Sequence, residues 1–462
     1  MGRSVMNIPR LVIAGVHTGV GKTTMTLGIM AALKKKNFTV QPFKVGPDYI
    51  DPGLHACAAG VVSHNLDSWM GSQEVVKTVF AKNAARAQVS IIEGVMGLYD
   101  TARGGRIIGS TAHVAMILQA PVVLVVNVKA MAQSCVALVK GYMEYEPGVQ
   151  IKGLILNNAS RFHVEDMRPL LEAELGIPVL GCVPERRDLS MPERHLGLVP
   201  AEENNNLMAT IGAMGDLIAA ELDLEALMAL AESAPPLEPY HPAMVRPHDL
   251  TIGVARDEAF SFYYQDSLDF LNELGAELLF FSPLRDNTIP EVDGLYLGGG
   301  FPEMFLERLG ANAAMLDSIH AACKQQMPIF GECGGFMYLC EYIRDFSGQA
   351  WPAAGLIPAQ VEMTHRLAAL GYVEATARQD SVIARRGDVV RGHEFHYSQL
   401  TGIGADQAAF SLQGGMGSDQ RADGYAQGNL FASYVHLHLR SNPQAAHNFL
   451  AACRSYRAKA RN

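Results

Sequence analysis

The chain has 462 residues, of which 49% are hydrophobic and 18% charged, and it is too long for one ordinary domain. Its net charge of −10 and its lack of long basic blocks argue against nucleic-acid partners. No apolar run reaches the roughly 18 residues that a membrane-spanning helix needs. Seven cysteines without a CxxC pair, and no evident signal peptide, favour a reducing compartment, so we expect a cytoplasmic protein without membrane partners.

The first half of the chain alternates between buried strands and helices. An apolar run at 11–15 leads into a glycine-rich loop and a helical pattern that extends to about residue 36. Runs of Val, Ile and Leu at 89–93, 121–127 and 151–156 predict further strands. Such runs are typical of a parallel sheet with helices on both faces, so this half is predicted to be α/β and doubly wound.

Five prolines between residues 235 and 247 indicate a linker, because proline is unfavourable in helix interiors and central strands. A second α/β pattern follows, which predicts a second doubly wound domain. We therefore expect a first domain at 1–232, a linker at 233–248 and a second domain at 249–462. The predicted strands of the second domain are 250–254, 277–281, 293–297 and 328–331, and its predicted helices are 263–273 and 311–325.

Residues 15–24, GVHTGVGKTT, have the composition of a phosphate-binding loop. Glycines between a strand and a helix let backbone N–H groups point at phosphates. Lys22 is expected to reach the β- and γ-phosphates, and the Thr23 hydroxyl to hold Mg²⁺. Five residues rather than four separate Gly15 from Gly21, which departs from the strict pattern, and a glycine-rich turn without a ligand is the alternative.

Two acidic segments are placed to complete a metal site. Asp48 lies in a loop between two prolines, and Glu93 ends a predicted strand, where open sheets place ligand groups. Mg²⁺ takes one or two carboxylates together with phosphate oxygens and water, so both residues are predicted ligands. Asp51 and Asp100 are expected to help position a carboxylate or the metal. A helix cap or a solvated turn is the alternative for each of the four.

Cys333 lies in the glycine-rich turn GECGG, between a predicted strand and a predicted helix. A sharp turn of this kind exposes a nucleophile, and a helix N-terminus lowers the pKa of a thiol. We therefore predict an exposed nucleophilic thiolate, with a buried structural cysteine as the alternative. The glycines at 298–300 follow another strand, so backbone amides at Gly299 and Gly334 are the predicted oxyanion donors.

A nucleophile of this type also needs a base, for which residues 433–438, SYVHLH, offer two histidines. Their alternation predicts that His436 and His438 share one strand face, and one of them is expected to be only a core residue.

Together these motifs resemble the cobyrinate a,c-diamide synthases, glutamine-dependent amidotransferases of the corrinoid pathway. The likeness runs almost from end to end of the chain. It implies a dethiobiotin-synthetase-like ATP domain with a P-loop NTPase-like parallel sheet, followed by a class I, triad-type glutamine amidotransferase domain. Besides the phosphate loop and the cysteine turn, it rests on residues 44–52, 93–100, 192–198, 253–257, 297–303, 391–398 and 433–438.

The resemblance also implies roles for single residues. It makes Cys333 the nucleophile and His436 its activator. The implied ATP contacts are Gly19, Gly21, Lys22, Thr23, Thr24 and Asn157, the last reading the adenine. The implied metal ligands are Thr23, Asp48 and Glu93. The implied substrate contacts are Lys44, Asp51, Asp100, Arg194 and His195, and a solvated surface charge is the alternative reading of the arginine.

The sequence departs from the family pattern at two positions. Triad glutaminases usually carry a Glu two residues after the catalytic histidine, where this chain has His438, so only a Cys–His pair is predicted. Asn127 stands at a strand end where relatives are expected to have an Asp, so no metal role is predicted for that strand.

The activity implied by the resemblance is amidation of the a and c acetate carboxylates of cobyrinate in cobalamin biosynthesis. ATP and Mg²⁺ would form an acyl phosphate, L-glutamine would supply ammonia, and the enzyme would be a homodimer. The same chemistry on another tetrapyrrole, nickel sirohydrochlorin or sirohaem, is the nearer alternative. An ATP-switch scaffold with an inert glutaminase-like part is the more distant one.

Overall fold

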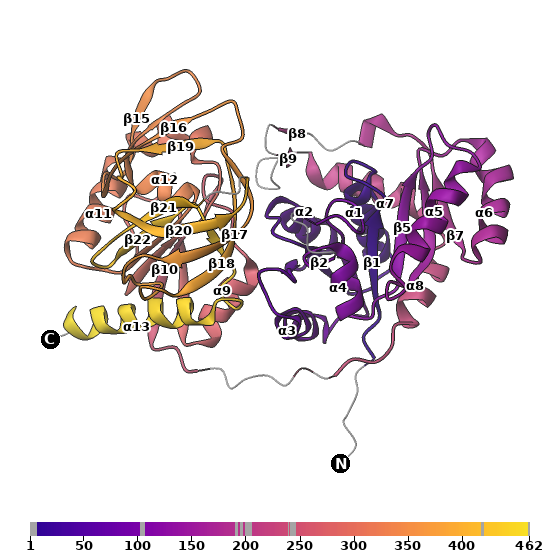
Figure 1. Ribbon diagram of the computed structural model, residues 1–462, viewed down its shortest axis with the longest axis horizontal. Helices are drawn as coiled ribbons and strands as arrows, with labels where there is room; N and C mark the ends of the chain where they lie inside the picture. The colour runs from indigo at the N-terminus through magenta and orange to yellow at the C-terminus, as the bar shows by residue number, and fades with distance from the viewer. Residues whose placement is uncertain are drawn as a thin grey trace, which may run out of the picture. The chain divides into compact units, whose positions relative to one another are not determined.

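The computed structural model describes residues 7–101, 107–189, 193–194, 197–198, 206–238, 240, 246–416 and 420–460. The chain divides into two compact units, Met1–Pro242 and Ala243–Asn462, and Figure 1 labels many of their helices and strands. Within the described ranges, no helix is both long enough and apolar enough to cross a membrane.

The first unit is built on a seven-stranded sheet with the order β3-β2-β4-β1-β5-β6-β7. All neighbouring strands in it run parallel. From β1 the chain moves outward on one side to β2 and β3, and then returns through β4 to the other side. Connections between parallel strands of one sheet are right-handed crossovers. When the chain changes its direction along the sheet, the connecting helices therefore move to the other face, and helices cover both faces, as doubly wound folds require.

The predicted strands of the first unit are confirmed, and their side chains are almost entirely buried. The strands are β1 Arg10–Gly15, β2 Val40–Val45, β3 His64–Leu66, β4 Val89–Glu93, β5 Val122–Asn127, β6 Ile151–Asn157 and β7 Val179–Val183, with a separate pair β8 Glu193–Arg194 and β9 Gly197–Leu198. The helices are α1 Lys22–Lys35, α2 Ile50–Ala59, α3 Gln73–Ala84, α4 Thr111–Ile117, α5 Ser134–Tyr145, α6 Arg168–Leu175, α7 Leu207–Glu221 and α8 Leu224–Glu232.

The second unit contains a ten-stranded mixed sheet with the order β11-β10-β12-β13-β22-β21-β20-β17-β18-β23. The part from β11 to β22 is parallel, and the remaining neighbours are antiparallel. A smaller sheet, β15-β14-β16-β19, accompanies it. The sequence analysis predicted the first four parallel strands, β10 to β13, but not the parallel strand β22, the antiparallel part or the smaller sheet.

The bounds of the second unit are as follows. Its strands are β10 Leu250–Ala255, β11 Ala276–Phe281, β12 Gly294–Leu297, β13 Ile329–Glu332, β14 Cys340–Arg344, β15 Ala350–Pro352, β16 Ile357–Met363, β17 Ala369–Ala377, β18 Val389–His396, β19 Ser398–Thr401, β20 Ala408–Gly414, β21 Arg421–Gln427, β22 Leu430–Ser433 and β23 His436–Leu437. Its helices are α9 Gln265–Glu273, α10 Leu306–Ala311, α11 Ala313–Lys324, α12 Gly334–Leu339 and α13 Pro443–Ala460.

Candidate functional site

The glycine-rich loop of the first unit joins β1, the middle strand, to α1. Gly19 and Gly21 have φ angles of 80° and 98°, a conformation that costs little only for glycine. A Cβ on Gly21 would also overlap the side-chain amide nitrogen of Asn157. That amide donates to the Val20 carbonyl at 2.9 Å, so the end of β6 is fixed against the loop.

Lys22 begins α1, and its Nζ donates to the His17 carbonyl at 3.3 Å across the loop. Burial, and then the charge of nearby Lys44, lowers the pKa of Lys22 to about 8. A phosphate in the loop would favour the charged ammonium again, because an adjacent anion raises the pKa of a lysine. The loop therefore has both the backbone geometry and the cation of a phosphate site.

A pocket of about 160 Å³ adjoins the loop, and two of the predicted ATP contacts, Thr24 and Asn157, line it. Most of the other lining side chains are apolar, which is typical of a pocket that holds a planar ring with a few polar groups to orient it. The pocket is therefore suited to the base of a nucleotide whose phosphates lie in the loop. The other lining residues are Met25, Asn158, Val183, Pro184, Arg186, Leu189, Met214, Leu217 and Ile218.

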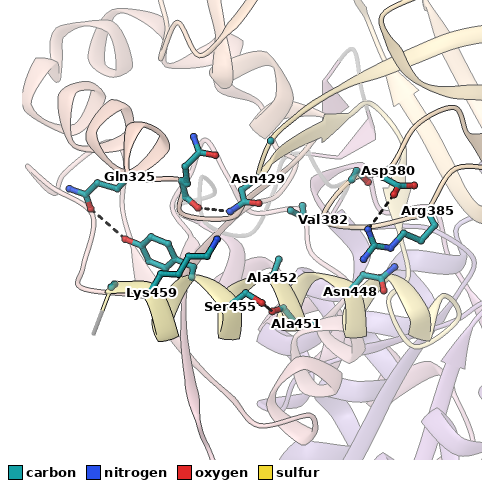
Figure 2. A pocket seen from close by; sticks show the side chains of 15 residues that line it. Gln325, Asp380, Val382, Arg385, Asn429, Asn448, Ala451, Ala452, Ser455 and Lys459 are labelled. Atoms are coloured by element: carbon teal, nitrogen blue, oxygen red, sulfur yellow. Dashed lines mark hydrogen bonds and ion pairs between the residues drawn. The ribbon is translucent and has the colours of Figure 1, made fainter. Parts of the chain in front are cut away.

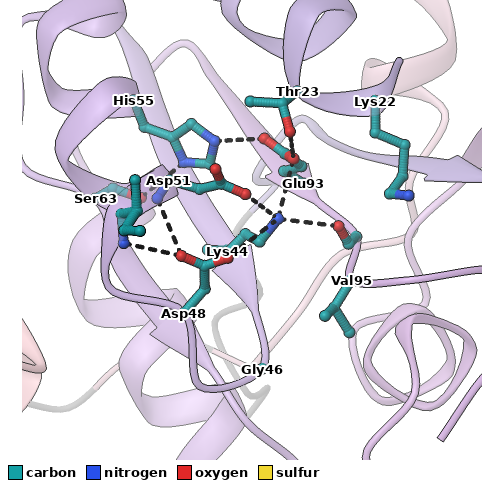
Figure 3. Close-up of polar contacts among 12 residues, drawn as sticks. Lys22, Thr23, Lys44, Gly46, Asp48, Asp51, His55, Ser63, Glu93 and Val95 are labelled. Carbon is teal, nitrogen blue, oxygen red and sulfur yellow. Dashed lines mark hydrogen bonds and ion pairs between the residues drawn. The ribbon is translucent and has the colours of Figure 1, made fainter. Parts of the chain in front are cut away.

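A buried charge cluster lies at the carboxyl ends of β2 and β4 (Figure 3). Lys44 and Glu93 are partners in the register of these parallel strands, and their side chains are 4% and 0% exposed. The Lys44 Nζ lies 2.5 Å from Asp51 Oδ2 and 3.0 Å from Glu93 Oε1. The Thr23 hydroxyl donates to the same Glu93 oxygen at 2.7 Å, which connects the cluster to the phosphate loop.

The electrostatics of this cluster follow from three carboxylates around one ammonium. Burial alone would raise the pKa of Glu93, but Lys44 and then His55 outweigh burial and hold that pKa well below its usual value. Burial and the neighbouring charge of Asp48 raise the pKa of Asp51, despite its contact with Lys44. The cluster therefore has an excess of acidic groups over cations, which a bound divalent cation would offset.

The donor set fits Mg²⁺ as a partner of bound phosphates. Mg²⁺ prefers hydroxyl and carboxylate oxygens together with phosphate oxygens and water. Thr23 and Glu93 provide such oxygens beside the phosphate loop. Among the described residues, no group of three or more His, Cys, Asp or Glu side chains could hold a metal alone. Phosphate oxygens and water would therefore have to complete the coordination.

The structure separates the two roles that the sequence left open for Asp48. Its Oδ1 accepts hydrogen bonds from the backbone N–H groups of Ile50 and Asp51, at 2.9 and 3.0 Å, and so caps the start of α2. Its Oδ2 faces the charge cluster, 4.0 Å from Lys44 Nζ. One oxygen therefore has the capping role, and the other remains available beside the cluster.

The predicted substrate contacts have different surroundings. Lys44 and Asp51 lie inside the buried cluster, only 3% and 7% exposed, and not on an open surface. Asp100 accepts a hydrogen bond from the Gly97 N–H at 2.9 Å and so caps its own loop, which is the alternative to a substrate contact. Arg194 belongs to the short strand β8, and His195 lies outside the described residues.

His55 is a member of the cluster that the sequence analysis missed. It is fully buried, with Nε2 2.6 Å from Glu93 Oε2 and Nδ1 3.1 Å from the Ser63 hydroxyl. Since a carboxylate oxygen only accepts, His55 Nε2 is the donor, and Glu93 is oriented from both sides. The available signal was the spacing of His55 four residues after Asp51 on α2, which places both on one helix face.

We expect His55→Ala to reduce ATP-dependent amidation about 10- to 100-fold, because Glu93 Oε2 loses its donor and the carboxylate can rotate away from Thr23. His55→Gln, which retains an N–H donor, should restore part of the loss. The check is a Mg²⁺ titration of activity and of nucleotide binding, in which the alanine variant should need more Mg²⁺. An unchanged Mg²⁺ requirement would mean that His55 does not orient Glu93.

The second unit places Cys333 in a tight turn between β13 and α12. Its φ of 47° and ψ of −103° are strained for a residue with a side chain, and such strain is common at nucleophiles. The Gly335 N–H donates to the Gly298 carbonyl at 2.9 Å, and a Cβ on Gly335 would overlap the Leu297 carbonyl. The turn therefore packs directly against the glycine loop at 298–300.

His436 packs against the same glycine loop. A Cβ on Gly299 would overlap the His436 ring at Cε1, and a Cβ on Gly334 would lie 3.0 Å from the Gly300 nitrogen. The loop thus contacts both the Cys333 turn and the imidazole. The residues predicted as nucleophile, base and oxyanion donors meet at one place.

The prediction of an exposed thiolate at Cys333 is wrong. The residue is only 5% exposed, and burial raises the pKa of its thiol well above the usual value, with the charge of Glu303 adding to the effect. The Gly334 N–H opposes this shift but does not overcome it. Helix α12 has only six residues, so its N-terminal field is small.

Burial, and then the neighbouring histidines His393 and His396, lowers the pKa of His436 to about 3. The imidazole is therefore neutral at physiological pH. With a protonated thiol at Cys333, the resting pair is neutral. A neutral imidazole can accept a proton, which is the state that a base for a thiol nucleophile requires.

This protonation state predicts how the reaction of Cys333 with iodoacetamide depends on pH. Because the thiol pKa is raised, the thiolate fraction and the rate should increase about tenfold per pH unit between pH 6 and 9. Mass spectrometry of the peptide that contains Cys333 gives this rate separately from the partly exposed Cys57 and Cys323. A pH-independent rate would instead indicate a thiolate–imidazolium pair.

His438 does not share the surroundings of His436, contrary to the predicted common strand face. Strand β23 contains only His436 and Leu437, so the alternation ends before His438. The His438 Nδ1 lies 2.8 Å from the Ser441 hydroxyl, and its Nε2 lies 3.6 Å from Asp266 Oδ2. His438 therefore belongs to a separate buried polar group.

A polar hollow of about 640 Å³ lies along α13, and Figure 2 shows the side chains that line it. Several of these groups bond to one another: Tyr456 with Gln325 at 3.4 Å, and Arg385 with Asp380 at 3.5 Å. None of the residues predicted for catalysis or nucleotide binding lines it. It is therefore separate from the two sites described above.

Comparison with known proteins identifies both units. The model of CobQ/CobB/MinD/ParA nucleotide-binding domains matches residues 11–199, and that of CobB/CobQ-like glutamine amidotransferase domains matches residues 251–444. The protein is thus a glutamine amidotransferase with a nucleotide-binding domain.

The similarity to individual proteins extends over the whole chain. It is 43% identical to the cobyrinate a,c-diamide synthase of Caldanaerobacter subterraneus subsp. tengcongensis over 97% of this chain and 99% of that protein. It is 40% identical to the enzyme of the same name from Priestia megaterium, over 99% and 100% of the two chains. The chain belongs to the cobyrinate a,c-diamide synthase family, whose members are glutamine-dependent ligases of cobalamin biosynthesis.

Proposed function

We propose that this enzyme amidates the a and c acetate carboxylates of cobyrinate, with an acyl phosphate as the intermediate at each. The observation that carries the proposal is that one chain combines a phosphate loop beside a buried acidic cluster with a Cys–His pair beside a glycine loop. The first arrangement suits carboxylate activation by ATP, and the second suits the release of ammonia from glutamine.

The second unit would supply the nitrogen. As the Cys333 sulfur attacks the side-chain amide of glutamine, His436 takes the thiol proton, and the N–H groups of Gly299 and Gly334 stabilise the negative oxygen. The imidazolium then gives its proton to the leaving nitrogen, which departs as ammonia and leaves a γ-glutamyl thioester. Water hydrolyses this thioester to glutamate and restores the thiol.

The first unit would activate the acid. The loop amides and Lys22 hold the β- and γ-phosphates while an oxygen of the substrate carboxylate attacks the γ-phosphorus and ADP leaves. Ammonia attacks the carbonyl carbon of the resulting acyl phosphate, and inorganic phosphate departs to leave the amide. Mg²⁺ held by Thr23 and Glu93, with Asp48 nearby, would neutralise charge on the phosphates.

The substrate contacts are part of the same proposal. Asp100, Arg194 and His195 would meet the corrin and its carboxylates, while Lys44 and Asp51 act from the buried cluster on the reacting carboxylate. We also propose a homodimer, which sedimentation would test. A cytoplasmic location is supported by seven free cysteines, since disulfides are rare in that compartment.

Mass spectrometry of cobyrinic acid incubated with enzyme, glutamine, ATP and Mg²⁺ tests the proposal. Two successive acid-to-amide mass shifts are expected, and a parallel incubation should leave nickel sirohydrochlorin and sirohaem unchanged. An unmodified corrin together with an amidated sirohydrochlorin or sirohaem would assign the enzyme to the other tetrapyrrole.

A further inference from the structure

Glu332, the residue before the nucleophile, is a buried carboxyl group with partners on both oxygens. It ends β13, it is 2% exposed, and neither proposed half-reaction uses it. Its Oε1 accepts the backbone N–H of Leu437 at 2.8 Å, and its Oε2 accepts the Tyr296 hydroxyl at 2.7 Å. Burying a carboxyl group costs free energy, so its presence directly beside Cys333 calls for a specific role.

The partner of Oε1 places Glu332 next to the catalytic base. Leu437 directly follows His436, and the two form the whole of β23. The strand is held on one side by two residue pairs with β18, at Gly392 and His393. The hydrogen bond to Glu332 therefore connects the strand of the base to the strand of the nucleophile, across 105 residues of sequence.

The partner of Oε2 fixes the carboxyl group itself. Tyr296 is 1% exposed, and its ring stacks on Phe330 with centroids 4.7 Å apart and an interplanar angle of 5°. Tyr263 packs edge-on against Tyr296, and its own hydroxyl accepts the Gly298 N–H at 2.8 Å. A carboxyl group held by a side chain this confined has one orientation, so its other oxygen is fixed as well.

The residue in the usual third position, His438, contacts other groups. His438 has Ser441 and Asp266 as polar neighbours, and its ring packs edge-on against Tyr264. Glu332, in contrast, contacts the backbone next to His436 and is bonded covalently to Cys333. In enzymes with a complete triad, the third residue fixes the base relative to the nucleophile. The position of Glu332 allows it to have the same effect here.

We propose that Glu332 is the positioning residue of the Cys333–His436 pair. It acts on the backbone of β23 and does not touch the imidazole or the substrate. The inference rests only on the glutaminase part of the proposed function. The inference does not depend on which tetrapyrrole is the substrate, because the release of glutamate can be measured in the absence of a tetrapyrrole.

Burial also raises the pKa of Glu332 to about 8, from an ordinary value of 4.5. The folded protein thus holds this proton more tightly than the unfolded chain, so the residue's contribution to stability should fall as pH rises from about 4.5 to about 8. Glu332→Gln cannot ionise, and so should remove this part of the pH dependence of unfolding.

The test compares Glu332→Leu with Glu332→Gln in the full-length enzyme. In the glutamine variant, the amide oxygen can still accept the Leu437 N–H, and the amide nitrogen can donate to the Tyr296 oxygen. We expect Glu332→Leu to lower kcat for glutamate release about 100-fold with little change in the KM for glutamine, because misplacement of a catalytic group by about 1 Å has effects of this size. Glu332→Gln should stay within about threefold of the wild type.

Two further measurements separate positioning from general damage. Amidation with added ammonia should be unchanged in both variants. Alkylation of Cys333 by iodoacetamide should keep its rate, since that rate depends on the thiolate fraction and not on the aligned base. Full glutaminase activity in Glu332→Leu would overturn the proposal. So would an equal loss of kcat in Glu332→Gln, because charge and not hydrogen-bond geometry would then be responsible.

If Glu332→Leu loses both glutaminase and ammonia-dependent activity, the chain has not folded properly. The variant Tyr296→Phe then tests the positioning role of Glu332 instead. This variant removes only the hydroxyl that fixes Glu332 Oε2. A fall in kcat of about threefold to tenfold at constant KM supports the proposal. An unchanged kcat contradicts it.

Discussion

Cys333→Ser is expected to lower glutamine-dependent amidation by at least about a thousandfold while amidation with added ammonia stays near the wild-type rate. The serine hydroxyl is a much weaker nucleophile than the thiol, so no thioester forms and no ammonia is released. The phosphate loop and the acidic cluster are not changed. The measurement is the rate of amide formation with each nitrogen source, together with the release of glutamate.

Cys323→Ser provides the matched control, because it is the same substitution at a partly exposed cysteine on α11. It should leave both activities unchanged. If Cys333→Ser lost the ammonia-dependent reaction as well, while remaining folded, the division of the two half-reactions between the two units would be wrong.

Glu93→Gln is expected to have the opposite pattern. Amidation should fall about 100- to 1000-fold with either glutamine or ammonia, whereas glutamate release should persist. The substitution removes the negative charge that faces Thr23, Lys44 and His55, and it leaves the buried Lys44 with fewer anionic partners. Amide formation, glutamate release and nucleotide binding should be measured on the same preparation.

Glu74→Gln on α3 is a suitable control for Glu93→Gln, since the Glu74 side chain is 79% exposed and pairs with Lys77 at the surface. Its amidation rate should equal that of the wild type. An unimpaired Glu93→Gln enzyme would exclude the acidic cluster from the chemistry of the nucleotide.

The phosphate loop and many of the parallel strands could be predicted because their signals are local. Continuous apolar runs such as 122–126 suit buried parallel strands, and glycines before Lys22 suit a loop that wraps phosphates. The contact between Lys44 and Glu93 could not be predicted from local signals, because it depends on the order of β2, β4 and β1 in the sheet. The sequence analysis placed Glu93 at a strand end, but it predicted no strand at Lys44 and does not say which strands are neighbours.

Two errors concern burial, which is decided by tertiary packing. The turn at Cys333 was expected to expose a thiolate, but the glycine loop at 298–300 packs against it and removes water. His55 was missed because one histidine in an amphipathic helix resembles an ordinary core residue until Glu93 is placed beside it. Both depend on contacts between segments far apart in the sequence.

The antiparallel part of the second sheet was missed for a different reason. Strand β17, ALGYVEATA, has a glycine in its first half and only a partial alternation of burial, so neither strand pattern is clear. Its position is set by long pairings with β18 and β20. The strand predicted over 433–438 is shorter in the structure, where β23 contains only His436 and Leu437, and these two residues are held by β18 and Glu332.

The most direct test of the whole account is to follow the nitrogen. Cobyrinic acid is incubated with the enzyme, ATP, Mg²⁺ and glutamine labelled with ¹⁵N in its side-chain amide, in buffer with a small amount of unlabelled ammonium. The account predicts a corrin with two ¹⁵N amides, with one ADP formed for each amide. Unlabelled amides, or labelled ammonia released while the corrin remains an acid, would contradict it.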